Sequence, residues 1–201
     1  MAAAIDFWFD LGSTYSYLTA MRIDDAAAER GVAVRWRPFL LGPIFKSQGW
    51  DTSPFNLYPT KGRYMWRDLE RLAAEYGLPL KPPTPFPQNS VLPARVVLSF
   101  PEAERPAVAR AIFSAEFGEG RDVSGEAAIR PILAALGHDP DTAIGLALSD
   151  ANKLRLREET QAAADRGVFG APTFVTADGD LYWGNDRMER ALDAALRLAA
   201  A

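Results

Sequence analysis

Hydrophobic and polar positions divide the chain into two strand-rich ends around a long helical middle. Residues 4–10 (AIDFWFD) alternate and are rich in aromatic side chains, which predicts a buried or half-buried strand. Residues 13–31 show helical spacing of apolar positions and predict one helix that ends at Gly31. Residues 32–38 alternate again. This β-α-β order predicts two parallel strands joined by a right-handed crossover.

The middle of the chain carries no convincing strand pattern. Residues 43–59 are rich in Pro and Gly and predict an irregular loop, whereas residues 61–76 form an amphipathic helical pattern. The proline-dense segment KPPTPFPQNS then leads to a helix N-cap at Asn89 or Ser90. Further helices are predicted at 90–100, 104–118, 124–137, 140–149 and 150–167.

The C-terminal part returns to strands. Residues 171–176 and 181–183 predict a hairpin about the turn ADGD, and residues 186–200 predict a closing helix. Without the helical middle, the order is β-α-β followed by β-β-α, which is the order of a thioredoxin-like domain. We therefore expect an α/β fold, a thioredoxin-like domain with a large all-helical insertion. The predicted division is residues 1–41 and 166–201 for the first part and 42–165 for the second.

Composition narrows the possible chemistry. The 201 residues carry a formal charge of −4, 48% are hydrophobic, and none is cysteine. A chain of this kind buries a substantial core but offers no disulfide, thiolate nucleophile or Cys-X-X-Cys redox pair. The single histidine, His138, lies in the turn LGHDPD, so neither a histidine triad nor a multi-histidine metal site is expected.

Charge and hydropathy also bear on partners and location. No run of Lys and Arg is available to neutralise phosphates, so we expect no nucleic-acid partner. No apolar run reaches the roughly 18 residues of a membrane span, and the start MAAAIDFWFD turns acidic too early for a signal peptide. We predict a cytoplasmic protein without a membrane partner.

Two local features agree with the thioredoxin-like order. Pro172 opens a strand in the segment VFGAPTFV, where this fold places a cis-proline beside its active site; a trans-proline at a strand start is the alternative. At the first strand-to-helix junction, Ser13 and Ser16 have the spacing that two cysteines have in redox members of the fold.

Ser13 has two compatible interpretations. As a helix N-cap, its hydroxyl would accept a backbone hydrogen bond and contribute about 1 kcal/mol. As a functional group at the positive end of a helix, it would donate to a bound thiolate and lower the pKa of that thiol. Without a neighbouring base it is a poor covalent nucleophile.

The segment WGNDRM forms a second candidate cluster. A helix start that carries Asn185 and Asp186 offers backbone N–H groups to a carboxylate and a side-chain carboxylate to an ammonium group. Such a pair of partners fits the end of an amino acid. An ordinary Asn or Asp cap is the alternative.

The segments FDLGSTYSYL and VFGAPTFVTADGDLYWGNDRM together closely resemble the 2-hydroxychromene-2-carboxylate isomerase family. The segments LLGPIFK, KGRYMWRDLERLAAEYGLPL and PFPQNS are similar to it as well, so the resemblance spans nearly the whole chain. With kappa-class glutathione transferases, this family forms a DsbA-like branch of thioredoxin folds. Around the serine, the family pattern has bulkier residues, often including proline, where this chain has Gly12 and Thr14. This departure leaves the substrate less defined than the cofactor.

The resemblance implies a glutathione-dependent isomerase of aromatic-compound degradation. It acts on 2-hydroxychromene-2-carboxylate or a close analogue: a thiolate adds to the conjugated C=C of the opened form, the resulting single bond rotates, and expulsion of the thiolate re-forms the double bond and gives trans-o-hydroxybenzylidenepyruvate. Glutathione is then a cofactor that is not consumed. A small aromatic substrate and a homodimer are the implied partners.

The family also implies roles for particular residues. Ser13 would bind the glutathione sulfur, and Ala171, next to Pro172, would pair its backbone with the cysteinyl unit. The γ-glutamyl end would meet Asn185, Asp186 and Arg187. Polar contacts to the glycyl carboxylate or substrate are expected from Lys61 and Asn56, and Lys46 is either an anion contact or a surface lysine. A substrate wall is expected among aromatic residues that could equally belong to the core: Phe45, Phe86 and Phe113, with Phe117 and Trp66.

Two other functions stay open on this sequence. A kappa-like transferase would leave glutathione attached to an electrophile and would consume it. A non-catalytic thioredoxin-like binding module would use Ser13 and Asn185 only as helix caps.

Overall fold

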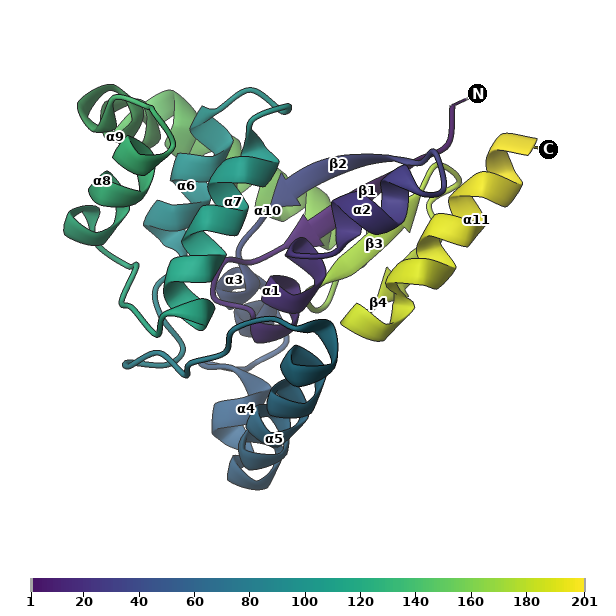
Figure 1. Ribbon diagram of the computed structural model, residues 1–201, viewed down its shortest axis with the longest axis horizontal. Helices are drawn as coiled ribbons and strands as arrows, with labels where there is room; N and C mark the ends of the chain where they lie inside the picture. The colour runs from purple at the N-terminus through teal and green to yellow at the C-terminus, as the bar shows by residue number, and fades with distance from the viewer. Residues whose placement is uncertain (1, 201) are drawn as a thin grey trace.

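A four-stranded mixed sheet lies at the centre of the computed structural model, which describes residues 2–200 (Figure 1). The strand order is β2-β1-β3-β4. β1 (Ala4–Phe9) pairs in parallel with β2 (Ala33–Pro38) and antiparallel with β3 (Thr173–Thr176). β3 and β4 (Leu181–Trp183) form the predicted hairpin. The thioredoxin-like order of strands is thus confirmed.

β1 is one of the two inner strands of the sheet, and its aromatic side chains are buried on both faces. Phe7 stacks on Phe174 at 5.6 Å and meets Trp36 edge-on at 5.0 Å, and these rings join the larger hydrophobic core. On the opposite face, Trp8 packs with Phe39 in a second, smaller cluster. With both faces covered, the carboxyl end of β1 is held firmly where the chain turns toward Ser13.

The first helical segment is shorter than predicted. Instead of one helix over residues 13–31, the structure has α1 (Thr14–Ala20) and α2 (Ile23–Ala28). The prediction was wrong because Arg22, with φ −126°, leaves the helical conformation between them. Its guanidinium pairs with a C-terminal glutamate and a buried amide, contacts that no local pattern encodes.

The segment predicted to be an irregular loop contains two short helices. α3 (Leu41–Ser47) begins where the backbone N–H of Leu41 donates to the carboxylate of Asp10, 2.7 Å away. α4 (Pro54–Leu57) begins after Ser53, whose hydroxyl accepts from the N–H of Phe55. The long-range hydrogen bond to Asp10 stabilises the start of α3, which the local content of Pro and Gly does not predict.

The following helix, α5 (Pro59–Tyr76), confirms the amphipathic prediction and ends at Gly77, whose φ of +66° suits a residue without a side chain. In Figure 1, α4 and α5 project below the sheet, and α5 contacts α1.

Helices alone fill the rest of the middle, and the described residues between 41 and 165 contain no strand. They are α6 (Val91–Ser99), α7 (Arg105–Phe113), the π-helical turn η1 (Ser114–Gly118), α8 (Glu126–Ala135), α9 (Pro140–Leu148) and α10 (Asp150–Asp165). α10 contacts β2 and packs against the smaller cluster, so it lies at the boundary of the two proposed parts. The division into 1–41 with 166–201 and 42–165 stays a prediction.

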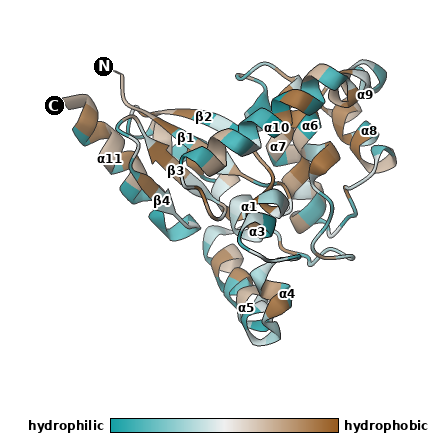
Figure 2. Ribbon diagram, turned by 180° about the vertical axis from the view of Figure 1, so that it is seen from behind, coloured by the Kyte–Doolittle hydropathy of each residue, from teal (hydrophilic) through white to brown (hydrophobic). Residues whose placement is uncertain are grey.

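The chain closes with a 3-10 turn, η2 (Asn185–Arg187), and α11 (Met188–Ala200). α11 contacts β1 and β3 with its apolar face. In Figure 2, hydrophobic and hydrophilic residues alternate along α11, as expected for a helix with one buried face. Its start, like that of α1, points to the same end of the sheet.

Candidate active site

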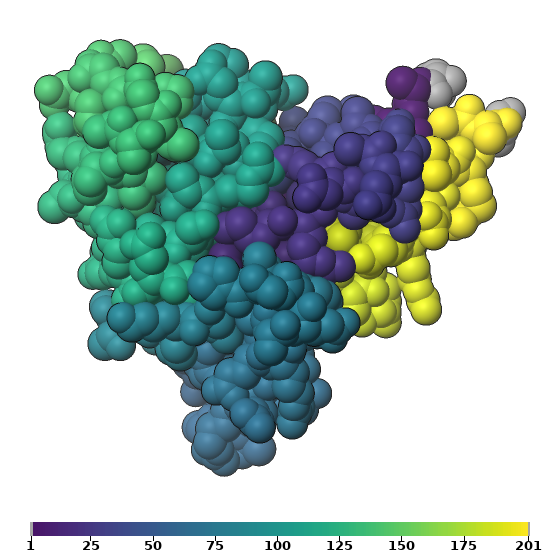
Figure 3. All heavy atoms as spheres, in the orientation of Figure 1, coloured from purple at the N-terminus to yellow at the C-terminus, as the bar shows by residue number. Residues whose placement is uncertain are grey.

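A cavity of about 1450 Å³ opens where β1 ends. One wall, here called the sheet side, comes from the starts of α1, β3 and η2; it includes Ser13, Pro172 and Asn185. The other wall, the helical side, comes from α3, α4, the start of α5 and the proline-rich connector. In Figure 3 the purple N-terminal residues lie between the teal helical segment and the yellow C-terminal segment, so distant parts of the sequence meet here.

Ser13 is the N-cap of α1, as predicted. Its hydroxyl oxygen accepts from the backbone N–H of Ser16 at 3.3 Å and donates to the carbonyl of Ala171 at 3.1 Å. Ser16 is different, since its side chain is fully buried and its hydroxyl has no partner within residues 2–200. Of the two serines in the cysteine-like spacing, only Ser13 lines the cavity.

The Ala171-Pro172 peptide bond is cis, which confirms the expectation from fold analogy. The carbonyl of Pro172 accepts from the N–H of Gly184 at 2.9 Å and so extends the hairpin to the cavity wall. A Cβ on Gly170 would lie 2.4 Å from the indole nitrogen of Trp183, so a larger residue at this position would displace that exposed ring. This turn therefore presents the backbone of Ala171 beside Ser13.

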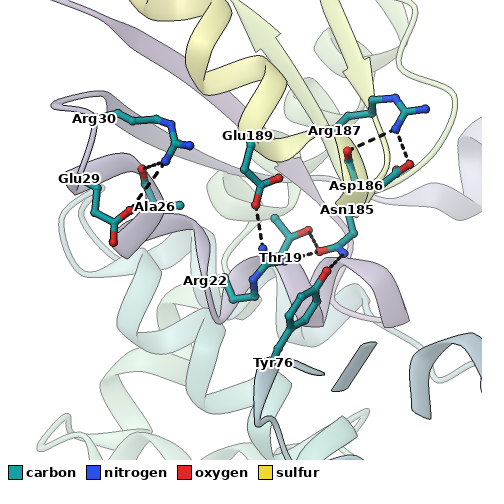
Figure 4. Close-up of polar contacts among 10 residues, drawn as sticks. All are labelled: Thr19, Arg22, Ala26, Glu29, Arg30, Tyr76, Asn185, Asp186, Arg187 and Glu189. Carbon is teal, nitrogen blue, oxygen red and sulfur yellow. Dashed lines mark hydrogen bonds and ion pairs between the residues drawn. The ribbon is translucent and has the colours of Figure 1, made fainter. Parts of the chain in front are cut away.

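Asn185 is buried, and its side chain turns into the protein (Figure 4). Its Oδ1 accepts from the Thr19 hydroxyl at 3.0 Å and from Arg22 at 3.4 Å, and its Nδ2 donates to the Tyr76 hydroxyl at 3.3 Å. Asp186 and Arg187 form an exposed ion pair at the rim. The structure thus brings the three predicted residues to the cavity: the side chain of Asn185 is anchored inside the protein, whereas those of Asp186 and Arg187 are exposed.

Asp10 is a cavity residue that the sequence analysis missed. Its carboxylate is buried and accepts from the N–H groups of Gly12 at 2.8 Å and Leu41 at 2.7 Å, so it ties the sheet side to α3. Burial raises the pKa of Asp10 above its usual value despite these hydrogen bonds. The signal was an acidic residue immediately after the aromatic run Phe7-Trp8-Phe9 at the end of β1.

Glu116 forms a second buried acid, in the π-helical turn η1. Burial, and then the charge of Asp10, raise its pKa well above the ordinary range, and its Oε1 has no partner in the described structure. Glu116 is accordingly neutral at pH values where surface carboxylates are charged.

The aromatic candidates separate into wall and core. Phe45 and Phe86 line the helical side, where Phe86 packs edge-on against Trp66 at 4.9 Å. Phe113 does not line the cavity: it is fully buried among aromatic rings of β1, α1 and η1. That expectation was wrong because α7 turns this position toward the sheet, and Phe117 lies in the same core.

The polar candidates of the helical block also separate. Lys61 lies in the cavity wall, with its ammonium 5.0 Å from the ring centre of Tyr58. Asn56 does not line the cavity; it is exposed on α4 and donates to Thr52 at 3.1 Å. The expected contact from Asn56 is therefore corrected, because α4 turns its side chain outward. Lys46 is a surface lysine on α3.

Other site types find no support in the described residues. Between residues 2 and 200 no three His, Cys, Asp or Glu side chains are grouped so that they could hold a metal ion. None of the described helices combines the length and the hydropathy needed to cross a membrane.

A helix start carrying a serine and a cis-proline turn in contact with it, both on the wall of one cavity, define the class of the protein. The family model of the DSBA-like thioredoxin domain matches residues 4–196, and the chain belongs to this class. Within it, the chain is 32% identical over 185 residues to the 2-hydroxychromene-2-carboxylate isomerase of Pseudomonas putida, covering 92% of this chain and 90% of that protein. The chain belongs to the 2-hydroxychromene-2-carboxylate isomerase family.

A solved structure supports the same placement. A 2-hydroxychromene-2-carboxylate isomerase superposes with a TM-score of 0.86 and 32% identity, covering 98% of this chain and 96% of that one. A more distant relative, glutathione S-transferase kappa 1 of Caenorhabditis elegans, is 26% identical over 203 residues, covering 94% of this chain and 89% of the relative.

Proposed function

We propose that the protein is a glutathione-dependent cis-trans isomerase that interconverts 2-hydroxychromene-2-carboxylate and trans-o-hydroxybenzylidenepyruvate, or a close aromatic analogue. The observation that carries the proposal is the position of Ser13: a hydroxyl at a helix start, opposite the cis-proline turn, in a large and mostly apolar cavity. The names of the isomerase relatives and of the kappa-class transferases support the reaction and the cofactor.

The sheet side fits glutathione. Ser13 donates to the carbonyl of Ala171, which is also an acceptor for a peptide N–H of a tripeptide laid along this turn. When that carbonyl takes a ligand N–H, the Ser13 hydroxyl is free to donate to a sulfur atom at the positive end of α1. The carboxylate of Asp186 at the rim suits the ammonium group of a γ-glutamyl end.

The helical side suits the aromatic substrate. Phe45 and Phe86 supply an apolar wall, and Lys61 supplies a positive charge for a substrate carboxylate or a developing enolate. Bound glutathione would contribute the thiolate that adds reversibly to the conjugated C=C bond. The chain's own task is to keep that thiolate charged, to hold the substrate against it and to exclude water.

A kappa-like transferase is the second candidate, because a kappa-class relative matches nearly the whole chain. The two differ in stoichiometry: a transferase consumes one free thiol per turnover, and an isomerase leaves the thiol concentration constant. A homodimer in the cytoplasm stays a prediction for either activity.

The test is the rate of 2-hydroxychromene-2-carboxylate isomerisation, followed by ultraviolet absorbance with and without reduced glutathione. Ser13→Ala removes a hydrogen bond to a charged group, so kcat/KM should fall by about 10- to 150-fold. Ser16→Ala is the matched control and should stay within about threefold, because its hydroxyl is buried without a partner.

Conversion that needs glutathione, is lost in Ser13→Ala and leaves the free thiol undiminished supports the isomerase. No conversion by the wild type, or equal rates in the two variants, contradicts it. Loss of free thiol in step with turnover supports the transferase instead.

A further inference from the structure

Arg22 lies behind the sheet side of the cavity and does not line it. It faces a separate surface hollow of about 460 Å³, together with Tyr76 and Glu189. Figure 4 shows its guanidinium between these two residues and Asn185. Arg22 thus contacts, from outside, the residue that forms the start of η2 on the cavity wall.

The guanidinium makes three contacts at once. Its Nη2 donates to the Glu189 carboxylate at 2.8 Å, and its Nη1 donates to Oδ1 of Asn185 at 3.4 Å. Its planar face lies 3.7 Å from the ring centre of Tyr76. A planar group with five N–H donors satisfies all three partners together, whereas the point charge of a lysine does not.

These contacts hold the side chain of Asn185 in one orientation. With Thr19 and Tyr76 as its other partners, the buried amide has its oxygen and one N–H of its nitrogen hydrogen-bonded inside the protein. Asn185 lines the cavity, and its anchored side chain fixes the position of the backbone at the start of η2 on the cavity wall. That backbone carries Asp186, whose carboxylate stands at the rim.

We propose that Arg22 is a positioning residue for the γ-glutamyl end of glutathione: by clamping Asn185 from behind, it holds the start of η2 and Asp186 in place to receive that end. This inference rests on the proposed function, since it assumes that glutathione occupies the sheet side. Arg22 touches neither glutathione nor the aromatic substrate.

Arg30 provides a matched control. Like Arg22, it joins the region of α2 to α11 through an ion pair, in this case with Asp193 at 3.1 Å. It also donates to the carbonyl of Ala26 at 3.0 Å, but it makes no contact with Asn185 (Figure 4). Removing Arg30 therefore removes a comparable ion pair and leaves the clamp intact.

The test measures the dissociation constant of reduced glutathione by titration calorimetry, a readout independent of turnover. Arg22→Ala should weaken binding by about tenfold, whereas Arg30→Ala should change it by less than about twofold. In the assay, the KM for glutathione should rise in Arg22→Ala while the KM for the chromene substrate stays constant. If Arg22→Ala fails to fold, Arg22→Lys keeps the positive charge but loses the planar set of N–H donors, and it should also weaken glutathione binding.

A double-mutant cycle tests whether Arg22 acts through Asn185. If Arg22 acts through Asn185, the variant carrying both Arg22→Ala and Asn185→Ala should bind glutathione no more weakly than Asn185→Ala alone. Equal effects of Arg22→Ala and Arg30→Ala, or additive effects in the cycle, would overturn the inference. Failure of the wild type to bind glutathione at all would instead overturn the proposed function.

Discussion

The two sides of the cavity are built in different ways. The sheet side is held by buried hydrogen bonds between segments far apart in the chain, such as Ser13 with Ala171 and Thr19 with Asn185. The helical side is formed by short helices and a connector, and its aromatic residues are held by packing, Phe45 against Trp50 and Phe86 against Trp66. Directional hydrogen bonds specify one geometry, whereas apolar packing accepts several shapes of similar volume.

This difference indicates which ligand each side of the cavity suits. Under the proposed function, the fixed donors and acceptors of the sheet side suit glutathione. The apolar wall of the helical side suits an aromatic substrate, and a change in the shape of that wall leaves the donors and acceptors of the sheet side in place. Asp10 is the link between the two, because it binds Gly12 on one side and Leu41 on the other.

The largest effect should come from replacing aromatic residues by alanine, with loss of stability for a core residue and loss of substrate affinity for a wall residue. Phe113→Ala removes a fully buried ring and should cost about 3–5 kcal/mol of the free energy of unfolding. Phe86→Ala should cost far less but raise the KM for the aromatic substrate by about 2- to 12-fold, with unchanged glutathione binding. Urea unfolding and steady-state kinetics distinguish them, and a purely kinetic effect of Phe113→Ala would contradict its place in the core.

A substitution at Gly62 should disturb the helical side selectively. A Cβ there would lie 2.6 Å from the carbonyl oxygen of Phe55, so α4 must move away from α5 in Gly62→Ala, at a cost of about 1–3 kcal/mol. The KM for the chromene should rise while the calorimetric affinity for glutathione stays constant. Gly145→Ala in α9 is the control, since nothing lies within 4 Å of its added Cβ. A parallel loss of glutathione affinity would show that the two sides are not separable.

The buried carboxyl group of Glu116 should make the free energy of unfolding depend on pH. Because the pKa of Glu116 is raised above 4.5 on folding, the folded state holds a proton that the unfolded state releases. The free energy of unfolding should therefore fall as pH rises above about 4.5, by about 1.4 kcal/mol per unit until the folded pKa is reached. Glu116→Gln does not titrate and should lack this component when urea midpoints are compared from pH 5 to pH 8; identical slopes would refute it.

The smallest effects should come from the polar candidates of the helical block. Lys61→Ala should raise the KM for the carboxylate substrate by about 1.5- to 5-fold, and less at high salt, because its charge is largely solvated. Asn56→Ala should change neither kinetics nor stability beyond about 0.5 kcal/mol, since its side chain is exposed and hydrogen-bonds to Thr52 at the surface. A larger rise in KM for Asn56→Ala than for Lys61→Ala would contradict the placement of Lys61 in the cavity wall and of Asn56 outside it.

The amino-acid sequence by itself determined the strands, the long helices and Ser13 as a helix cap. These follow from local periodicity and capping chemistry, which act over a few residues. It also placed Pro172 and Asn185 beside Ser13 through the thioredoxin-like order of elements, because that order specifies which strand and helix ends meet.

Only the tertiary structure decided how side chains at that end of the sheet are used. It broke the first helix at Arg22, turned the Asn185 amide inward and buried Phe113 while leaving Phe86 on the cavity wall. Each outcome depends on partners 109 to 167 residues away or on which face of a helix meets the sheet. Local sequence patterns carry no information about such partners, since burial and long-range hydrogen bonds arise only when the segments pack together.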